Sequence, residues 1–229
     1  MTEGPFLRRV LRGRTNARVF DGGSALGCEA ALLTKAGFKV VANEIDSRLA
    51  RRARSTLEAM KLSIEMTAID WRDLRTTFAE KSFDVCLLIG NSLGLLSRVE
   101  DRHLAVSNMF ELLKPGGMFI VDQRNYEYMF SQRDAVLGGS FQYSGRVMYC
   151  ERAIVGRPTI IEAERVRMSC FDKYTGRALG HFDVHPFREG ELRGLLQHCG
   201  FEGLDEFFDF RERAAEHWDF QTMVARKPL

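Results

Sequence analysis

The chain has 229 residues, of which 45% are hydrophobic and 28% charged, and its formal net charge is +2. This length and composition predict one globular domain, and the near-neutral charge argues against a nucleic-acid or membrane-surface protein. No apolar run approaches the roughly 20 residues that span a bilayer, and no signal peptide is recognisable, so the sequence predicts a cytoplasmic protein. The five cysteines are scattered and form no CxxC pair, which predicts neither a disulfide framework nor a metal site.

Five short apolar runs alternate with helical patterns over the first half of the chain. The predicted strands are Ala17–Phe20, Lys39–Asn43, Ile64–Ile69, Phe83–Ile89 and Met118–Asp122. The predicted helices are Cys28–Ala36, Asp46–Met60 and Asp101–Leu113. This alternation predicts an α/β fold with a mostly parallel sheet. The strands of such a sheet end at one common edge, and ligands of open α/β sheets bind there.

After Tyr126 the pattern changes to extended segments. These are Arg146–Val155, Thr159–Phe171 and Ala178–Val184, with turns predicted at Gly156-Arg157-Pro158 and Tyr174-Thr175-Gly176. We expect an antiparallel β flap over residues 141–186, inserted after the fifth strand of a single domain that spans residues 1–229. A helix over Glu189–Cys199 and a strand over Phe220–Arg226 follow, and we expect the chain to end in an antiparallel hairpin at the sheet edge.

A glycine-rich turn, Asp21–Gly27, follows the first strand. Its small residues let the backbone pass close to a ligand, and the next helix begins with unpaired N–H groups. On its own, the turn is explained either by a bound ligand or by a tight connection. A nicotinamide dehydrogenase would show G-x-G-x-x-G, and the spacing of Gly23, Ala25 and Gly27 fits that pattern poorly.

Acidic and aromatic residues follow the next two strands. Glu44 ends the second strand, 17 positions after Gly27, where a carboxylate accepts hydrogen bonds from ribose hydroxyls. Asp70 and Trp71 end the third strand, where an acid accepts from an exocyclic amine and an aromatic ring covers a base. Singly, Glu44 is better explained as a solvated acid and Trp71 as a packing residue. Together with the turn, they outline a site for an adenosine-type ligand.

These motifs resemble those of class I S-adenosylmethionine-dependent methyltransferases. Asp21-x-Gly23-x-Ala25-x-Gly27 is similar to the first motif of that family, with Ala25 in place of the middle glycine, and Leu113–Gly117 is similar to the loop before its fifth strand. The resemblance implies a Rossmann-like seven-stranded sheet whose last strand is antiparallel. It also implies S-adenosylmethionine as cofactor and S-adenosylhomocysteine as product, without a metal.

Two segments resemble the glycine and sarcosine N-methyltransferases more narrowly. Ile89–Leu96 is similar to their LGNSFxHL-type segment, and Val121–Tyr128 is similar to their IDHRNYDY-type segment. In that family the matching Asn and Arg hold the carboxylate of the amino-acid substrate, so the resemblance nominates Asn91 and Arg124. The residue chemistry agrees, because a guanidinium grips a carboxylate with two hydrogen bonds. An ion pair with a protein acid is the alternative explanation for Arg124.

The acceptor side departs from the family. Only 16 residues precede Ala17, where the family carries a long segment that closes over its site. The family lines its amine pocket with flap tyrosines. Tyr143 matches one of them, whereas Arg165 and Asp183-Val184 stand where two more are expected. Glycine itself is therefore in doubt as the substrate.

Two kinds of side chain are candidates for orienting the amine or accepting its proton. We expect Tyr126 or Tyr143 to orient it through a hydroxyl group. His181 or His185 is either a proton acceptor near neutral pH or a surface and packing residue.

The sequence therefore predicts a cofactor set and an acceptor set. The cofactor-binding residues are Asp21, Gly22, Gly23, Ala25, Gly27, Glu44, Ile45, Asp70, Trp71, Ile89 and Asn91. The catalytic residues are Arg124, Asn91, Tyr126 and Tyr143. The reaction implied is in-line displacement of the sulfonium methyl group by a neutral amine, helped by alignment and exclusion of water.

Other functions stay open at this point. They are methylation of an oxygen atom on another small molecule, methylation of RNA, and cofactor binding without activity in the chain alone. A basic run on the second helix, Arg48 to Arg54, favours RNA weakly, but a solvated helix face explains it better. We expect a small amine or amino acid as the partner, no membrane, and a chain that either acts alone or forms a homo-oligomer.

Overall fold

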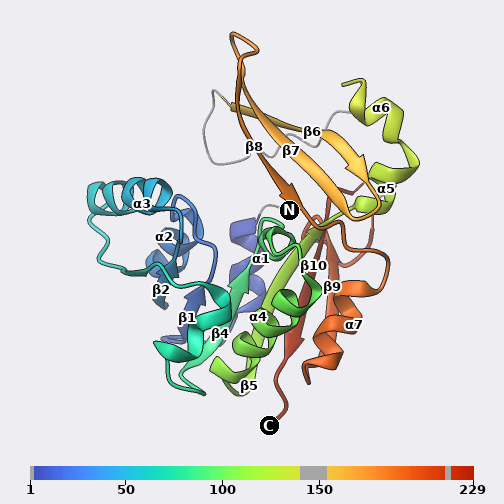
Figure 1. The fold of residues 1–229 in the computed structure, drawn as a ribbon. Coiled ribbons are helices and arrows are strands. Elements are labelled where there is room, and N and C mark those ends of the chain that lie inside the picture. The colour runs from blue at the N-terminus through green and yellow to red at the C-terminus, as the bar shows by residue number, and fades with distance from the viewer. Residues whose placement is uncertain (1–2, 140–153, 215–217) are drawn as a thin grey trace.

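The computed structural model describes residues 3–139, 154–214 and 218–229 of the 229-residue chain. A seven-stranded sheet with the order β3-β2-β1-β4-β5-β10-β9 forms the body of the molecule, and a separate three-stranded sheet, β6-β7-β8, projects beyond one edge of it (Figure 1). This is the predicted fold class, a Rossmann-like sheet with an antiparallel flap inserted after the fifth strand.

The first five strands run parallel, as the sequence predicts. They are β1 (Arg18–Asp21), β2 (Lys39–Asn43), β3 (Glu65–Thr67), β4 (Phe83–Leu88) and β5 (Leu113–Arg124). The helices between them are α2 (Cys28–Lys35), α3 (Ser47–Ala59), the 3-10 helices η1 (Trp71–Thr76) and η2 (Ser92–Leu95), and α4 (Val99–Leu112). Because the strands are parallel, the loops that follow β1, β2, β3, β4 and β5 meet at one edge.

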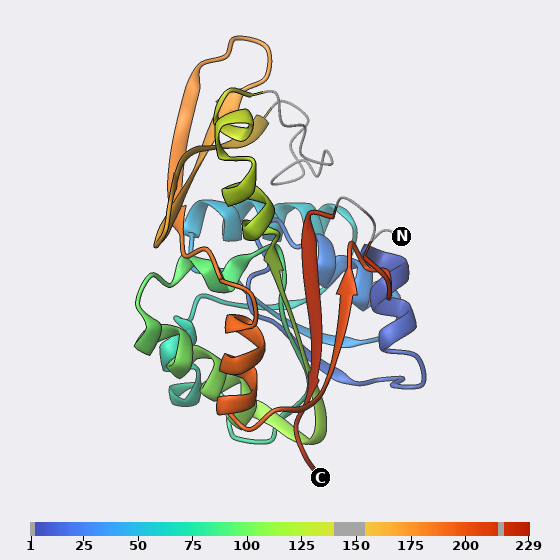
Figure 2. The same cartoon turned by 90° about the vertical axis from the view of Figure 1, so that its right-hand side faces the viewer.

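Helices cover both faces of the sheet, so the strands are apolar on both sides (Figure 2). Successive residues of β5 show this: Phe119 and Val121 join one core with α4 and α7 (Glu191–His198), whereas Met118 and Ile120 join the other with α1 (Glu3–Val10) and α2. Helix α1 was not predicted from the sequence, and it buries Phe6 in the second core.

The last two strands form the expected antiparallel hairpin. β10 (Phe220–Arg226) lies between β5 and β9 (Glu202–Phe208) and runs antiparallel to both. The register places Phe220 opposite Arg124, so the loop between β9 and β10 returns beside the carboxyl end of β5. No helix in the described part of the chain is long and apolar enough to cross a membrane.

The flap follows two short helices, α5 (Tyr126–Ser131) and α6 (Arg133–Leu137). Its strands are β6 (Ile154–Glu162), β7 (Arg165–Asp172) and β8 (Ala178–Val184), in antiparallel pairs. One flap face packs on α5 through a small core that contains Tyr126, Met168 and Val184. The flap thereby rests on the segment that leaves β5.

Two flap predictions are wrong. Gly156-Arg157-Pro158 is not a turn but lies inside β6, and the single segment Thr159–Phe171 is divided by a turn at residues 163–164 into β6 and β7. Proline is tolerated there because β6 is an edge strand and its register shifts between Pro158 and Ile160. Most of Arg146–Val155 falls outside the described residues, and the turn at 174–176 is confirmed between β7 and β8.

Candidate active site

The glycine-rich loop after β1 is tightly packed against its neighbours. A Cβ atom on Gly22 would lie 3.0 Å from the carbonyl oxygen of Leu87, and one on Gly23 would lie 3.0 Å from Ser92 Oγ. Ala25 and Gly27 both have left-handed backbone, with φ of 46° and 78°. An alanine in this region costs about 1–2 kcal/mol, so the surrounding contacts hold the loop in its shape.

Glu44 fastens this loop to the end of β2. One of its carboxylate oxygens accepts from the backbone N–H of Ala25 at 2.9 Å, and the other accepts from the N–H of Asp46 at 2.8 Å. The side chain is half-buried, and each carboxylate oxygen has a second lone pair. The structure therefore brings Glu44 to the glycine-rich loop, as the sequence predicts.

Trp71 also lies against the glycine-rich loop. Its indole Nε1–H donates to the carbonyl oxygen of Gly22 at 2.6 Å, and its ring is 3.7 Å from the Cβ position of Gly23. Asp70 faces Arg72, which donates to it from Nε at 2.9 Å and from Nη2 at 2.6 Å. These charged hydrogen bonds lower the pKa of the Asp70 carboxyl.

Polar groups without partners line the base of the loop. Asp21 is 2% exposed, and burial, with added repulsion from Glu29 and Glu44, raises the pKa of its carboxyl well above the ordinary value. Neither Asp21 Oδ2 nor Ser24 Oγ has a hydrogen-bond partner among the described residues. A cradle of small residues with unsatisfied acceptors fits a ligand that brings its own donors, such as the ammonium group of S-adenosylmethionine.

The loop after β4 carries Asn91, which has left-handed backbone with φ of 64°. Its N–H donates to Asp122 Oδ1 at 2.6 Å, and its side-chain amide lies 2.7 Å from the hydroxyl of Tyr126. The backbone N–H of Arg124 donates to Asn91 Oδ1 at 3.2 Å. The structure thus brings together three of the predicted acceptor residues. Tyr126 is 1% exposed, so its hydroxyl supports Asn91 directly.

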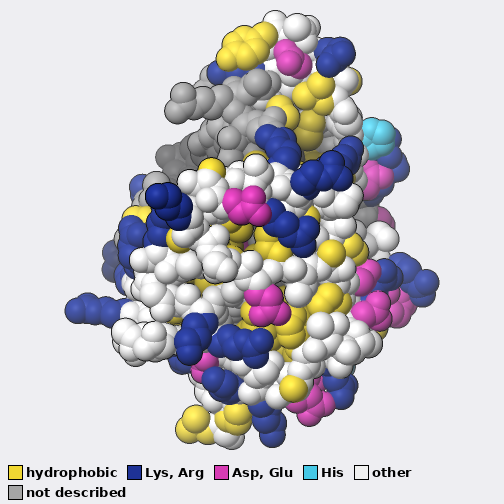
Figure 3. All heavy atoms as spheres, turned by 90° about the vertical axis from the view of Figure 1, so that its left-hand side faces the viewer, with side chains coloured by type: hydrophobic (Ala, Val, Ile, Leu, Met, Phe, Trp, Pro, Cys, Tyr) yellow, Lys and Arg dark blue, Asp and Glu magenta, His cyan; other side chains and the backbone are white. Residues whose placement is uncertain are grey.

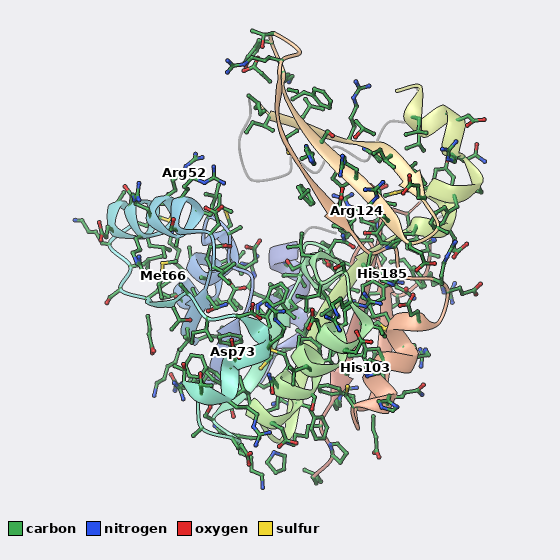
Figure 4. The ribbon with its side chains drawn as sticks, in the orientation of Figure 1. Arg52, Met66, Asp73, His103, Arg124 and His185 are labelled. Atoms are coloured by element: carbon green, nitrogen blue, oxygen red, sulfur yellow. The ribbon has the colours of Figure 1, made fainter. Side chains whose placement is uncertain are left out.

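Arg124 lies where the sheet meets the flap (Figure 4). The side chain is 7% exposed, and its guanidinium carbon stands 4.6 Å from the ring centroid of Phe220 on β10. This contact orients a cation at the carboxyl edge of β5. Tyr143, the fourth predicted catalytic residue, lies outside the described residues.

The two flap histidines differ in their surroundings. His185 is 8% exposed, and its Nε2 lies 2.7 Å from Oε1 of the half-buried Glu191. His181 is exposed on β8. Figure 3 shows the face that carries α3, where Lys and Arg side chains lie among Asp and Glu side chains instead of forming one basic trough.

Asn43 and Asp122 shape the site but belong to neither set of residues predicted from the sequence. Asn43 is 1% exposed and donates to the carbonyl oxygens of Gly22 and Ile69, at 3.2 and 2.9 Å, while its Oδ1 accepts from Ile69 N–H at 2.8 Å. It therefore joins the loops after β1 and β3. A polar residue that ends an otherwise apolar strand was the available signal for both residues.

Known proteins that are similar to this chain are methyltransferases. A family model described as "Methyltransferase domain" matches residues 20–121. The glycine/sarcosine N-methyltransferase of Aphanothece halophytica is 26% identical over 227 residues, which cover 99% of this chain and 82% of that protein. The enzyme of the same name from Parasynechococcus marenigrum is 28% identical over 98% of this chain and 77% of its own length.

The chain is an S-adenosylmethionine-dependent methyltransferase. The resemblance inferred from the motifs is thereby confirmed, and with it the cofactor. Among solved structures, a methyltransferase from Clostridium acetobutylicum has the same fold, with a TM-score of 0.77 at 17% identity over 99% of this chain and 91% of that one. An amino pentose methyltransferase from Micromonospora echinaspora, solved with S-adenosylmethionine bound, has a TM-score of 0.65 at 17% identity, over 98% and 90% of the two chains.

Asn43→Asp tests the hydrogen bonds by which Asn43 joins the loops after β1 and β3. The carboxylate keeps the shape but cannot donate to the two carbonyl oxygens, and it buries a charge, so we expect the free energy of unfolding to fall by about 3 kcal/mol or more. Urea unfolding measures the change. Gln197→Glu, an amide-to-acid change on the exposed face of α7, is the matched control. A loss no larger than that of the control would contradict this role of Asn43.

Proposed function

We propose that the enzyme transfers a methyl group to the nitrogen of a small amine or amino acid that carries a carboxylate. The observation that supports this most directly is the joining of Asn91 and Arg124 at the ends of β4 and β5. Ser92, the next residue after Asn91, contacts the glycine-rich loop, so the acceptor pair lies directly beside the cofactor loop. Relatives named glycine/sarcosine N-methyltransferase support the same substrate class.

For the cofactor we propose roles for the loops after β1, β2 and β3. The glycine-rich loop, including Gly22, Gly23, Ala25 and Gly27, holds the methionine part, and Asp21 accepts from its ammonium group. Glu44 accepts from the ribose hydroxyls through its remaining lone pairs, and Asp70 accepts from the adenine amine. Ile45 is 61% exposed beside Glu44 and covers one side of the adenine ring, with Ile89 lining the site directly after β4.

We assign the acceptor to residues at the carboxyl ends of β4 and β5. When bound, S-adenosylmethionine supplies a methyl group on a good leaving group, so the protein has to align and desolvate the nucleophile. Arg124 grips the carboxylate, and Asn91 donates an amide hydrogen bond to it. Tyr126 fixes the Asn91 side chain. The described flap strands β6, β7 and β8 cover the acceptor side of the site.

Calorimetry with S-adenosylmethionine, followed by methyl transfer to glycine, sarcosine, dimethylglycine and other amino acids, tests the proposed function. Binding together with turnover of a carboxylate-bearing amine is the expected result. Turnover confined to acceptors without a carboxylate would overturn the substrate class. Failure to bind the cofactor would contradict the proposed site.

Arg124→Lys separates acceptor binding from cofactor binding. Lysine keeps the charge but loses the planar, two-pronged donor, so we expect kcat/KM for the acceptor to fall by roughly tenfold or more. The dissociation constant of the cofactor should change by less than about twofold. Arg193→Lys, on α7, is the control substitution. An equal loss of cofactor and acceptor binding would count against the carboxylate clamp.

Glu44→Ala tests the ribose assignment. Losing hydrogen bonds to a charged group should weaken cofactor binding by about 1–3 kcal/mol, measured by calorimetry. Because Glu44 also accepts from Ala25 N–H, Glu44→Gln serves as a second variant that retains an acceptor oxygen for the loop. Unchanged cofactor affinity in both variants would exclude the ribose contact.

Asp21→Asn is expected to have opposite effects on stability and binding. A carboxyl whose folded-state pKa lies above its unfolded value destabilises the protein increasingly as pH rises past the unfolded value, because the folded state then has to give up a proton that it binds more tightly. The amide removes that cost, so thermal melting of the cofactor-free enzyme should rise at pH 7 and the difference should shrink on acidification. Cofactor affinity should fall by roughly tenfold because a charged acceptor is lost. A variant that melts lower and binds normally would refute both assignments.

A further inference from the structure

A buried arginine holds the loop that follows Asn91. Arg102 on α4 is 4% exposed, and its Nη1 donates to the backbone carbonyl oxygens of Leu96 and Ser97, at 2.9 and 2.8 Å. Its Nη2 lies 3.5 Å from Glu191 Oε1 on α7. A buried guanidinium needs such acceptors on all sides, because removing one leaves an uncompensated charge.

Glu191 connects that arginine to the base of the flap. Its Oε1 lies 2.7 Å from His185 Nε2, and its Oε2 accepts from the backbone N–H of Arg188 at 2.9 Å. His185 is the residue that directly follows β8, the last strand of the flap. One carboxylate thus joins α4, the start of α7 and the return segment of the flap.

The return segment of the flap meets the acceptor loop directly. The backbone N–H of His185 donates to the carbonyl oxygen of Gly94 at 2.7 Å. A Cβ atom on Gly94 would lie 3.2 Å from the carbonyl oxygen of His185 and 3.3 Å from Asn91 Nδ2. Gly94 is therefore in close contact both with the base of the flap and with the amide that we assign to the acceptor.

We infer that Glu191 is a positioning residue, which sets the acceptor side of the active site by fixing the base of the flap against η2. The path of contacts runs from Glu191 through His185 and Gly94 to Asn91, whose Oδ1 accepts from the N–H of Arg124. This inference rests on the proposed function, because it assigns the path to acceptor binding.

A purely structural role for Glu191 is the alternative explanation. Glu191 lies in the first turn of α7, where an acid stabilises a helix by interaction with its dipole. Such a role would lower stability and leave the kinetic parameters for the acceptor unchanged. The experiment must therefore separate stability from the geometry at Asn91.

The chain offers a matched control in a second ion pair that involves α7. Glu206 on β9 accepts from Arg193 Nε on α7 at 2.9 Å, and its side chain is 25% exposed, compared with 31% for Glu191. Glu206→Gln therefore weakens a similar ion pair of α7 that makes no contact with η2 or the flap in the described part of the chain. Both substitutions remove one negative charge and keep the size of the side chain.

Kinetics and cofactor binding form the first measurement. For Glu191→Gln we expect kcat/KM for the acceptor to fall by roughly tenfold, with the cofactor dissociation constant changed by less than about twofold. Glu206→Gln should leave both within about twofold. Equal acceptor kinetics in the two variants, or a matching loss of cofactor binding in Glu191→Gln, would overturn the inference.

Hydrogen exchange forms the second measurement and needs no acceptor. In Glu191→Gln, amide exchange should rise together in residues 92–97 and in residues 178–187, while residues 21–27 stay as protected as before. A rise confined to α7 would refute the positioning role. If the wild-type enzyme methylates none of the amines, the proposed function fails on that result alone, and the exchange pattern still decides whether Glu191 couples the flap to η2.

Discussion

Backbone groups at the carboxyl edge of the sheet have left the strand ladder, and buried ones need other partners. Side chains supply them here. The carbonyl oxygen of Gly22 accepts from Trp71 and Asn43, and Asp122 takes the N–H of Asn91. Glu44 does the same for the N–H of Ala25. The residues that shape the site are therefore also the residues that keep its loops folded, which limits how freely either set can be substituted.

The cofactor half and the acceptor half of the site are held by different parts of the fold. The glycine-rich loop, Glu44 and Trp71 stand on the parallel strands between the two cores, whereas Asn91 and Arg124 stand where β4, β5, β10 and the flap converge. Substitutions in the flap and in the loop between β9 and β10 can therefore alter the acceptor side without disturbing the cofactor half. On that side, two flap tyrosines of the resembling family are expected at positions that hold Arg165 and Asp183-Val184 in this chain.

Much of the fold could be predicted from the sequence because most strands are short runs with apolar residues, bounded by turn residues or charged residues. The β2, β8 and β10 ranges agree with prediction, and the glycine-rich turn lies where the motif puts it. The turn at Pro158 was mispredicted because proline is also tolerated in an edge strand at a register shift. The contact between His185 and Glu191 depends on tertiary packing and on no local sequence pattern. The sequence therefore pointed to His185 as a candidate but could not predict its partner.

The two tryptophans divide between the two halves of the site. Trp71 donates to Gly22 in the cofactor loop, whereas Trp218 packs its ring on Phe208, 5.0 Å between centroids, and its carbonyl oxygen accepts from Asn125 beside Arg124. Since the chain contains only these two, replacing either one leaves a single tryptophan, whose emission can be excited selectively over that of the five tyrosines. Emission from the Trp71-only enzyme would then follow events at the glycine-rich loop while the hydrogen bond from Trp71 to Gly22 is kept, so cofactor binding is readable without any added label.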